Sequence, residues 1–294
     1  MKLNQLEIFC KIVELGSFSK AAEAVHLSQP TLTEHIKSLE YHLGLPLLDR
    51  LGREVRPTKA GLILQDYARK IFQLKKEAEQ TLHGMKGDLR GDLTLGASTI
   101  PGEYILPPMI KRFRDDFPDT AVEVTIGDTR TIIADTIDSR VELGIVGAKM
   151  DHANLDYHPF VKDELICAVS ADSDWADIGS LSLEKLSTIP FIIREEGSGT
   201  RMTMENTFRN SRFHTSHLHV VMTLGSTAAV IQAIKSGAGC SILSRKAIEK
   251  DVANGELIFL PIEDVVFPRD FFIILRRRKA KSPLCDAFFS FLFK

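Results

Sequence analysis

Residues 17–40 carry two short helical patterns separated by a turn of only three residues. In the first pattern, Ser19 is expected to be the N-cap, and Ala21, Ala22 and Val25 form a narrow apolar face. Residues 26–28 form the turn. Two helical patterns joined this tightly predict a helix-turn-helix.

The second helix is expected to begin after Ser28, whose hydroxyl caps it, with Pro30 in the first turn, where a missing N–H costs nothing. Its apolar stripe must face the protein and consists of Leu32, Ile36, Leu39 and Leu43. The opposite side carries polar residues, which are Thr33, Glu34 and Lys37, with Gln29 and Thr31 at the exposed tip. Short polar side chains at the tip of a helix can enter a DNA major groove and contact base edges.

A basic cluster follows, in which Arg50, Arg53, Arg56 and Lys59 lie within ten residues and are opposed only by Glu54. Residues 53–58 are expected to form a short hairpin, or wing, and Thr58 to cap the next helix. An ordinary amphipathic helix pair would explain the first pattern alone, but cations fixed beside such a helix neutralise phosphates and set its register. The sequence therefore predicts binding to double-stranded DNA. The expected contact residues are Ser28, Gln29, Pro30, Thr31, Thr33, Lys37, Arg50, Arg53, Arg56 and Thr58.

This region resembles the winged helix-turn-helix of the LysR-type transcriptional regulators. The resembling segments are LEIF at 6–9 with Val13, GSFSKAA at 16–22, LSQPTLT at 27–33, IKSLE at 36–40, LGLPLLDR at 43–50 and PTKAG at 57–61. Leu48 stands where the family usually has an aromatic residue, which concerns packing rather than DNA contact. The organisation of the remaining chain is also similar, so the resemblance covers essentially all 294 residues.

Composition agrees with a globular protein of two or three domains, because 44% of the residues are apolar and 26% are charged. The formal net charge is only −2, but it is unevenly distributed. Residues 1–91 hold 14 Lys and Arg against 11 Asp and Glu, whereas the rest hold 23 against 28. The basic excess thus lies with the helix-turn-helix. No signal peptide and no apolar run of about 20 residues is present, so a cytoplasmic location is expected.

The four cysteines, Cys10, Cys167, Cys240 and Cys285, are scattered among apolar neighbours without a CxxC pair. They are expected to be buried small apolar residues. Some LysR-type proteins sense redox state through a cysteine pair in the regulatory domain, but the charge around Cys240 would not activate a thiolate.

A long helix is expected to run from Thr58 to about Met85. Its apolar residues step by threes and fours, close to a heptad seam, and are Ala60, Leu64, Tyr67, Ile71, Leu74, Ala78, Leu82 and Met85. Such a helix of roughly 28 residues spans about 42 Å and cannot bury this stripe within a small domain. Pairing with a second chain is therefore predicted, with packing against the C-terminal domain as the alternative. Gly84, Gly87 and Gly91 then form a hinge.

From residue 92 onward, short β-branched strands alternate with helices, which predicts parallel sheets in an α/β fold. Strands are expected at 92–97, 121–127, 143–147, 164–170, 190–194, 218–224, 240–243, 257–260 and 270–276, and helices at 101–117, 130–139, 200–210, 227–236, 244–253 and 282–293. The resemblance implies a two-lobed, periplasmic-binding-protein-like effector domain with crossovers near 161–164 and 263–269. The expected domains are 1–58 for the winged helix-turn-helix, 59–91 for the linker helix and hinge, and 92–294 for the effector domain. Lobe I takes 92–162 and 270–294, and lobe II takes 163–265. The basic run 276–281 is expected to be a solvated strand end.

Four strand-to-helix junctions are rich in hydroxyls and glycines, at 96–101, 127–131, 194–201 and 224–227. Ligands of open α/β lobes bind at such junctions, where backbone N–H groups, the helix dipole and hydroxyls make an anion site. Any one junction could be a plain helix cap, but four together favour a site between the lobes. The expected effector-binding residues are Ser98, Thr99, Thr129, Arg130, Thr131, Gly197, Ser198, Thr200, Arg201 and Ser226.

The GSGTR segment at 197–201 lacks the ending of a Walker loop, and it resembles LysR-type members that respond to small oxyanions or phosphorylated metabolites. A small anion such as sulfite, sulfate or a carboxylate is therefore the expected effector, with no cofactor. Glu195 and Glu196 argue against a highly charged anion unless they point away.

The sequence leaves two alternatives to a ligand-responsive regulator, an enzyme and a DNA-binding protein with an unliganded C-terminal domain. An enzyme lacks support, because there is no nucleophile elbow, metal triad or dinucleotide fingerprint. His214, His217 and His219 could suggest a metal, but a solvated loop explains them better. A DNA-binding protein with an unliganded C-terminal domain remains an alternative. The resemblance further implies self-association, as a dimer or a tetramer, and leaves RNA polymerase open as a partner.

Overall fold

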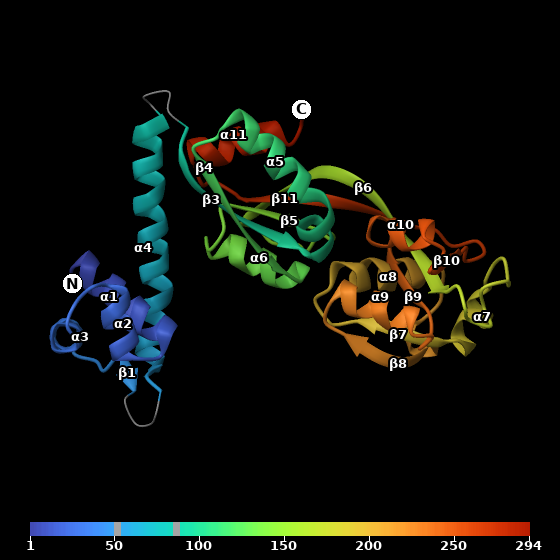
Figure 1. Cartoon of the computed structure of the whole chain (residues 1–294), viewed down its shortest axis with the longest axis horizontal. Coiled ribbons are helices and arrows are strands. Elements are labelled where there is room, and N and C mark those ends of the chain that lie inside the picture. The colour runs from blue at the N-terminus through green and yellow to red at the C-terminus, as the bar shows by residue number, and fades with distance from the viewer. Residues whose placement is uncertain (50–53, 85–88) are drawn as a thin grey trace. The chain divides into compact units, whose positions relative to one another are not determined.

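The computed structural model describes residues 1–49, 54–84 and 89–294 (Figure 1). By their internal contacts these residues form two units, Met1–Glu79 and Gln80–Lys294, and each unit has its own core. The first unit is helical with one small hairpin, and the second is a mixed α/β structure.

The first unit begins with three helices, α1 (Leu3–Leu15), α2 (Phe18–Ala24) and α3 (Gln29–Leu43). Ser17, rather than Ser19, caps α2, with its hydroxyl accepting from the backbone N–H of Lys20. The prediction was wrong because Gly16 ends α1 in a left-handed conformation, so the extended residue that starts α2 is the next one. Ser28 caps α3 and Pro30 lies in its first turn, as predicted.

The apolar stripe of α3 forms the centre of the first core. Leu32, Ile36 and Leu39 are fully buried and pack against Phe9 and Ile12 of α1. Leu43 was expected on the same stripe but is 37% exposed. It is the last residue of α3, and the chain turns away at Gly44 before the stripe is complete.

A short hairpin follows α3. Strand β1 (Leu48–Asp49) pairs antiparallel with β2 (Arg56–Pro57), so the wing begins earlier than the expected 53–58. Glu40 of α3 fixes its base, because one carboxylate oxygen accepts from the N–H groups of Leu47, at 2.8 Å, and Leu48, at 3.3 Å. Arg50 and Arg53 lie outside the described residues.

The long helix α4 (Lys59–Gly84) is capped by Thr58, whose hydroxyl accepts from the Gly61 N–H at 3.0 Å, as predicted. Near its start, Ala60 and Leu64 pack on the core of the first unit. Further apolar side chains of α4 are 55–66% exposed, and these are Leu62, Ile63, Tyr67, Leu74 and Leu82. None of the helices in the described residues is long and apolar enough to cross a membrane.

The second unit is built around a seven-stranded sheet of order β10-β6-β11-β5-β3-β4, with β9 also paired to β6, and a separate pair β7-β8. The strands are β3 (Gly91–Ser98), β4 (Thr120–Gly127), β5 (Leu143–Val146), β6 (Leu155–Ser170), β7 (Pro190–Arg194), β8 (His219–Leu224), β9 (Ser241–Ser244), β10 (Leu257–Leu260) and β11 (Phe267–Arg276). Strand β3 pairs parallel with β4 and β5, and β7 with β8, but all pairs of β6 and β11 are antiparallel. The sheet is therefore mixed: the predicted parallel pairing holds for β3 with β4 and β5 and for β7 with β8, but not for the pairs of β6 and β11.

Strands β6 and β11 run side by side from one lobe into the other (Figure 1). They were expected to start at 164 and 270, with crossovers near 161–164 and 263–269, but start at Leu155 and Phe267. Continuous antiparallel pairing satisfies the backbone groups of the crossover, which a buried loop could not do.

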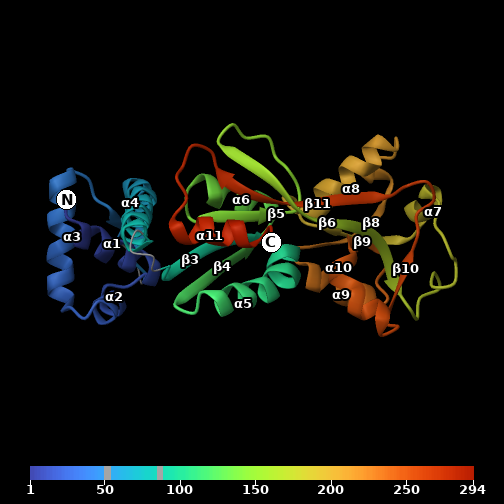
Figure 2. The ribbon, with the colours of Figure 1, turned by 90° about the horizontal axis from the view of Figure 1, so that it is seen from above.

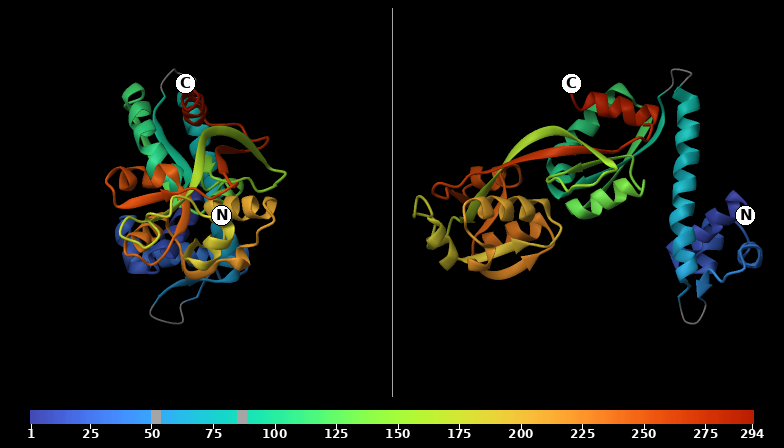
Figure 3. Two further views of the ribbon diagram at one scale, coloured as in Figure 1. Left: turned by 90° about the vertical axis from the view of Figure 1, so that its right-hand side faces the viewer. Right: turned by 180° about the vertical axis from the view of Figure 1, so that it is seen from behind.

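Helices cover both faces of each lobe (Figures 2 and 3). They are η1 (Pro101–Ile105, a π-helical turn), α5 (Leu106–Asp116), α6 (Thr129–Ile137), α7 (Leu183–Thr188), α8 (Gly199–Asn210), η2 (Thr215–His217), α9 (Thr227–Lys235), α10 (Arg245–Ala253) and α11 (Pro283–Phe291). In lobe I, α5 and α11 pack on one face and α6 on the other. In lobe II, α7 and α8 pack opposite α9 and α10. Cys167, Cys240 and Cys285 are buried as expected, whereas Cys10 is only half-buried.

A glycine at the start of α4 provides a test of the first unit. A Cβ on Gly61 would lie 2.1 Å from the carbonyl oxygen of Leu47, which is backbone and cannot swing away. We expect Gly61→Ala to lower the free energy of unfolding by about 1–3 kcal/mol, measured by urea titration. Gly225→Ala is the control, because no atom lies within 4 Å of that Cβ, and it should change stability by less than about 0.5 kcal/mol. Equal losses of unfolding free energy in the two variants would contradict the close approach of Gly61 to the carbonyl oxygen of Leu47.

Candidate effector site and DNA-binding surface

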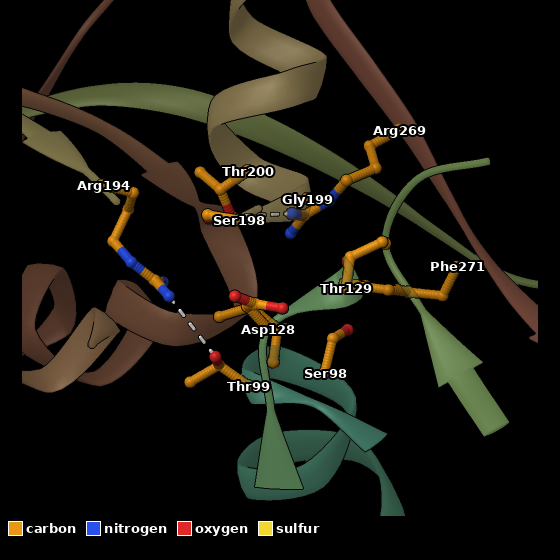
Figure 4. Close-up of a pocket in the computed structure, with 12 residues that line it drawn as sticks. Ser98, Thr99, Asp128, Thr129, Arg194, Ser198, Gly199, Thr200, Arg269 and Phe271 are labelled. Atoms are coloured by element: carbon orange, nitrogen blue, oxygen red, sulfur yellow. Dashed lines mark hydrogen bonds between the residues drawn. The ribbon is translucent and has the colours of Figure 1, made fainter. Parts of the chain in front are cut away.

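A small cavity in the second unit collects polar side chains from both lobes (Figure 4). Its space is about 10 Å³, enough for about one water molecule. The lining residues are Ser98, Thr99, Ile100, Asp128, Thr129, Gly147, Arg194, Ser198, Gly199, Thr200, Arg269 and Phe271. Most of them stand at strand ends and helix starts, as the junctions in the sequence predicted.

Helix N-termini from the two lobes meet at this cavity. Asp128 caps α6 by accepting from the Thr131 N–H at 2.6 Å, and Ser198 caps α8 by accepting from the Arg201 N–H. A Cβ on Gly199 would lie 2.5 Å from the hydroxyl oxygen of Thr129, so the two helix starts are in direct contact. Glycine at this position permits that approach.

Thr129 is fully buried at this contact, and its Oγ1 has no hydrogen-bond partner among the described residues. A buried hydroxyl without a partner costs roughly 1–3 kcal/mol, so natural proteins rarely retain one without a use. Thr129 therefore offers an unused donor and acceptor to whatever enters the cavity.

Arg194, at the end of β7, brings one positive charge to the cavity. It is 4% exposed, and its Nε and Nη2 each donate to a different oxygen of Glu195 at 2.7 Å. Nη1 donates to the Thr227 hydroxyl at 2.6 Å, and Nη2 reaches the Thr99 hydroxyl of the other lobe at 3.5 Å. Nearby, burial raises the pKa of the Glu103 carboxyl, and the charge of Arg194 opposes that shift.

Arg269, on the crossover strand β11, brings the second charge. Its Nε and Nη2 both donate to one oxygen of Asp163 on β6, the former at 3.0 Å, and Nη1 donates to the Thr200 hydroxyl at 2.9 Å. The guanidinium also lies over the ring of Phe271, 4.5 Å from its centroid. Burial lowers the pKa of Arg269 and Asp163 opposes that shift, but a guanidinium stays protonated at neutral pH.

The expected effector residues are only partly brought together. Ser98, Thr99, Thr129, Ser198 and Thr200 line the cavity, whereas Arg130, Thr131, Gly197, Arg201 and Ser226 do not. Arg130 and Thr131 are exposed, and Ser226 caps α9. Arg201 donates to Glu205 and to the carbonyl oxygen of Arg194, so it supports the site from outside.

The sequence analysis did not identify Arg194 and Arg269. These two arginines supply the positive charge of the cavity, which was expected from Arg130 and Arg201. One signal was available: each arginine interrupts an apolar strand, after residues 190–193 and before residues 271–275, where a buried charge must have a purpose. Their partners could not be foreseen, because Asp163 and Arg269 are 106 residues apart.

The expected DNA-contacting residues lie at the tip and outer face of α3 and on the wing. Ser28, Gln29, Pro30 and Lys37 are exposed, and Thr31 and Thr33 are half-buried. Arg56 is exposed on the wing and pairs with Glu54 at 3.5 Å. The hydroxyl of Thr58 is occupied, because it donates to the carbonyl oxygen of Pro46 and caps α4.

Comparison with known proteins agrees with this architecture. Residues 3–62 match the model of the bacterial regulatory helix-turn-helix protein of the lysR family, and residues 86–294 match the LysR substrate binding domain. The chain belongs to the LysR family of transcriptional regulators.

Relatives align over nearly the whole chain. The HTH-type transcriptional activator CmpR of Synechocystis sp. is 30% identical over 291 residues, covering 99% of this chain and 94% of CmpR. A probable RuBisCO transcriptional regulator of Nostoc sp. is 31% identical over 289 residues, covering 97% of this chain and 86% of that regulator.

Solved structures are similar as well. Full-length CbnR complexed with its target DNA matches with a TM-score of 0.76 at 20% identity, covering 100% of this chain and 99% of CbnR, which shows the shared fold. The regulatory domain of CcmR from Synechocystis, in complex with 2-PG, matches with a TM-score of 0.63 at 27% identity, covering 69% of this chain and 96% of the CcmR domain.

The protein is thus a DNA-binding transcriptional regulator with an effector-binding domain, in a family of regulators rather than enzymes. The predicted family, fold class and function are confirmed, and the enzyme alternative is set aside.

The ion pair at the crossover can be tested by separating its two partners. Arg269→Met leaves the buried carboxylate of Asp163 without its cation, and we expect a loss of about 3–5 kcal/mol in unfolding free energy. The double variant Arg269→Met with Asp163→Leu removes both charges and should recover most of that loss. Urea titration of four proteins measures the unfolding free energies: the original, Arg269→Met, Asp163→Leu and the double variant. Additive losses in the double variant would show that the two side chains act independently.

Proposed function

We propose that this regulator reads its operator with the tip of α3 and holds the DNA backbone with Lys37, Arg56 and the wing. Gln29 and Thr31 are the base-reading residues, because they stand exposed or half-exposed at the first turn of the helix. The tip of α3 and the base of the wing are shaped by Ser28, Pro30, Thr33 and Thr58. We also propose that Arg50 and Arg53 contact phosphates.

The proposal includes self-association through α4. Its exposed apolar side chains, Leu62, Ile63, Tyr67, Leu74 and Leu82, are those a solvated helix would avoid and a helix–helix interface would cover. A dimer formed this way presents two recognition helices to two half-sites. RNA polymerase as a further partner rests on the family resemblance alone.

Pairing of dimers into a tetramer has support in the second unit. Strand β4 is an edge of the seven-stranded sheet, and β8 pairs only with β7 among the described strands. Val220, Val221 and Met222 of β8 are 40–43% exposed. Apolar edge strands carry unpaired backbone groups that favour pairing with another chain. We also propose that the effector domain consists of lobe I at 92–162 and 270–294 and lobe II at 163–265.

We further propose that a small anion is the effector and that it binds between Thr129, Arg194 and Arg269. The observation that carries this proposal is the buried, unpartnered hydroxyl of Thr129 in a cavity that two buried guanidinium groups also line. Remaining N–H groups of both arginines and the start of α8 can donate to the anion. The related CcmR regulatory domain, solved with 2-PG, supports a small ligand in this domain.

Binding must widen the cavity, because space for one water molecule is too small for an oxyanion. Separation of the contact between Thr129 and Gly199 would provide the room and would change the angle between the lobes. An effector shifts the protein toward the arrangement for which it has the higher affinity, so it favours the wider arrangement. A change between the lobes then alters how the attached DNA-binding units are held.

The reading of DNA can be tested by comparing two substitutions. Gln29→Ala should weaken binding to the operator by about 1–3 kcal/mol and leave binding to scrambled DNA unchanged. Lys37→Ala should weaken both and reduce the salt dependence by about one counterion. Lys111→Ala removes an exposed cation of the second unit and is the control. Gel shifts at several salt concentrations measure the affinities. Equal effects of Gln29→Ala on both DNAs would exclude it from base reading.

The effector site can be tested with Thr129→Val, which keeps the side-chain shape. We expect a loss of about 1.5 kcal/mol, roughly tenfold, in anion affinity, and no loss of thermal stability, because the hydroxyl has no partner in the protein. Thr136→Val is the control on the same helix, since that hydroxyl donates to the carbonyl oxygen of Ile132. Calorimetry on the full chain with sulfite, sulfate, phosphate, acetate and 2-PG provides the measurement. If Thr129→Val binds the best of these anions as tightly as the original protein, the site lies elsewhere.

A further inference from the structure

A carboxylate stands inside the cavity that we propose for an anion. Figure 4 places the side chain of Asp128 between Thr99, Thr129 and Ser198, in the middle of the lining residues. An acidic group at the centre of an anion site repels an anionic ligand, so its presence there requires a specific role in binding.

Asp128 has few partners of its own. Its Oδ1 accepts from the Thr131 N–H at 2.6 Å as the cap of α6. Within the ranges that the structure describes, no cation pairs with this carboxylate and no other group donates to it. Its second oxygen, Oδ2, is therefore a free acceptor.

That free oxygen is held against the opposite lobe. A Cβ on Gly197 would lie 2.7 Å from Oδ2 of Asp128, so this oxygen packs on the glycine that precedes the cap of α8. Gly197 has a φ of +94°, a backbone conformation that favours glycine. The half-buried carboxylate thus stands at the contact of the two lobes.

The two arginines of the cavity do not neutralise Asp128. Arg194 is paired with Glu195 and Arg269 with Asp163, so each cation already has its own anion. With Asp128 included, these five groups have a formal charge of −1 before any ligand enters. A second full negative charge on the ligand would be repelled, whereas a donor on the ligand would satisfy Oδ2.

We propose that Asp128 makes this site selective for an anion that carries its own O–H, such as a singly protonated oxyanion or a hydroxy acid, and rejects a fully deprotonated dianion of the same size. The anionic oxygens of the ligand accept from Thr129 and the arginines, and its O–H donates to Oδ2 of Asp128. This inference rests on the proposed anion site and narrows its ligand class.

Inorganic phosphate and sulfate are the probes, because both are tetrahedral but only phosphate keeps a proton at neutral pH. Asp128→Asn retains the helix cap, since an amide oxygen accepts from the Thr131 N–H as well as a carboxylate does. We expect the original protein to bind phosphate at least about tenfold more tightly than sulfate. In Asp128→Asn, sulfate affinity should rise about tenfold and the preference for phosphate should vanish.

Asp138→Asn is the matched control, because Asp138 stands at the other end of α6 and pairs with Arg140 outside the cavity. It should leave both affinities unchanged in calorimetry on the full chain at pH 7. If sulfate binds the original protein as well as phosphate does, or if Asp128→Asn leaves the ratio unchanged, the selectivity is overturned and the anion site stands. If neither probe binds either protein, the inference falls, and if the wider anion panel also fails, the proposed anion effector falls with it.

Discussion

The buried pair of Arg269 and Asp163 is the interaction on which the effector domain depends. It joins β6 to β11 at the place where both strands cross between the lobes, and both side chains are almost completely buried. A buried ion pair contributes little net stability, but separating it is costly, so the pair holds the two strands in one register. Because Arg269 also donates to Thr200 at the start of α8, the crossover and the cavity wall share a single guanidinium. A ligand that contacts Arg269 therefore contacts the element about which the lobes are joined.

This arrangement explains why the cavity is both charged and closed. At the cavity the lobes contact each other through Thr129 and Gly199, through the Thr99–Arg194 hydrogen bond, and through Oδ2 of Asp128 against Gly197. A buried apolar cluster also joins them, with Ile100 and Ile105 from lobe I and Ile192 and Val230 from lobe II. The contact between Thr129 and Gly199 leaves a buried hydroxyl unsatisfied. A ligand that satisfies this hydroxyl would favour the arrangement of the lobes for which it has the higher affinity.

Local patterns in the sequence predicted most of the elements, because caps, turns and apolar periodicity are properties of neighbouring residues. Ser28, Pro30 and Thr58 were placed correctly for that reason, and the start of α4 agrees within about one residue, the usual accuracy of helix boundaries. Met85, at its predicted end, lies outside the described residues. The errors occur where distant residues decide. Leu43 loses its burial because Gly44 ends α3, β6 begins nine residues earlier because β11 pairs with it, and short α7 had too few residues to show a period.

The candidate site follows the same division between local and distant signals. Ser98, Thr99, Thr129, Ser198 and Thr200 were found because a hydroxyl at the start of a helix is a local signal. Arg194 and Arg269 were missed because a charge in an apolar strand acquires its role only from partners far along the chain, Thr99 in one case and Asp163 in the other. The cationic half of the site therefore resides in the sheet and its hydroxyl half in the helix starts. A change in the angle between the lobes would move the Thr129 hydroxyl of lobe I relative to Arg194 and Thr200 of lobe II, so a ligand that contacts both sides would bind one angle in preference to another.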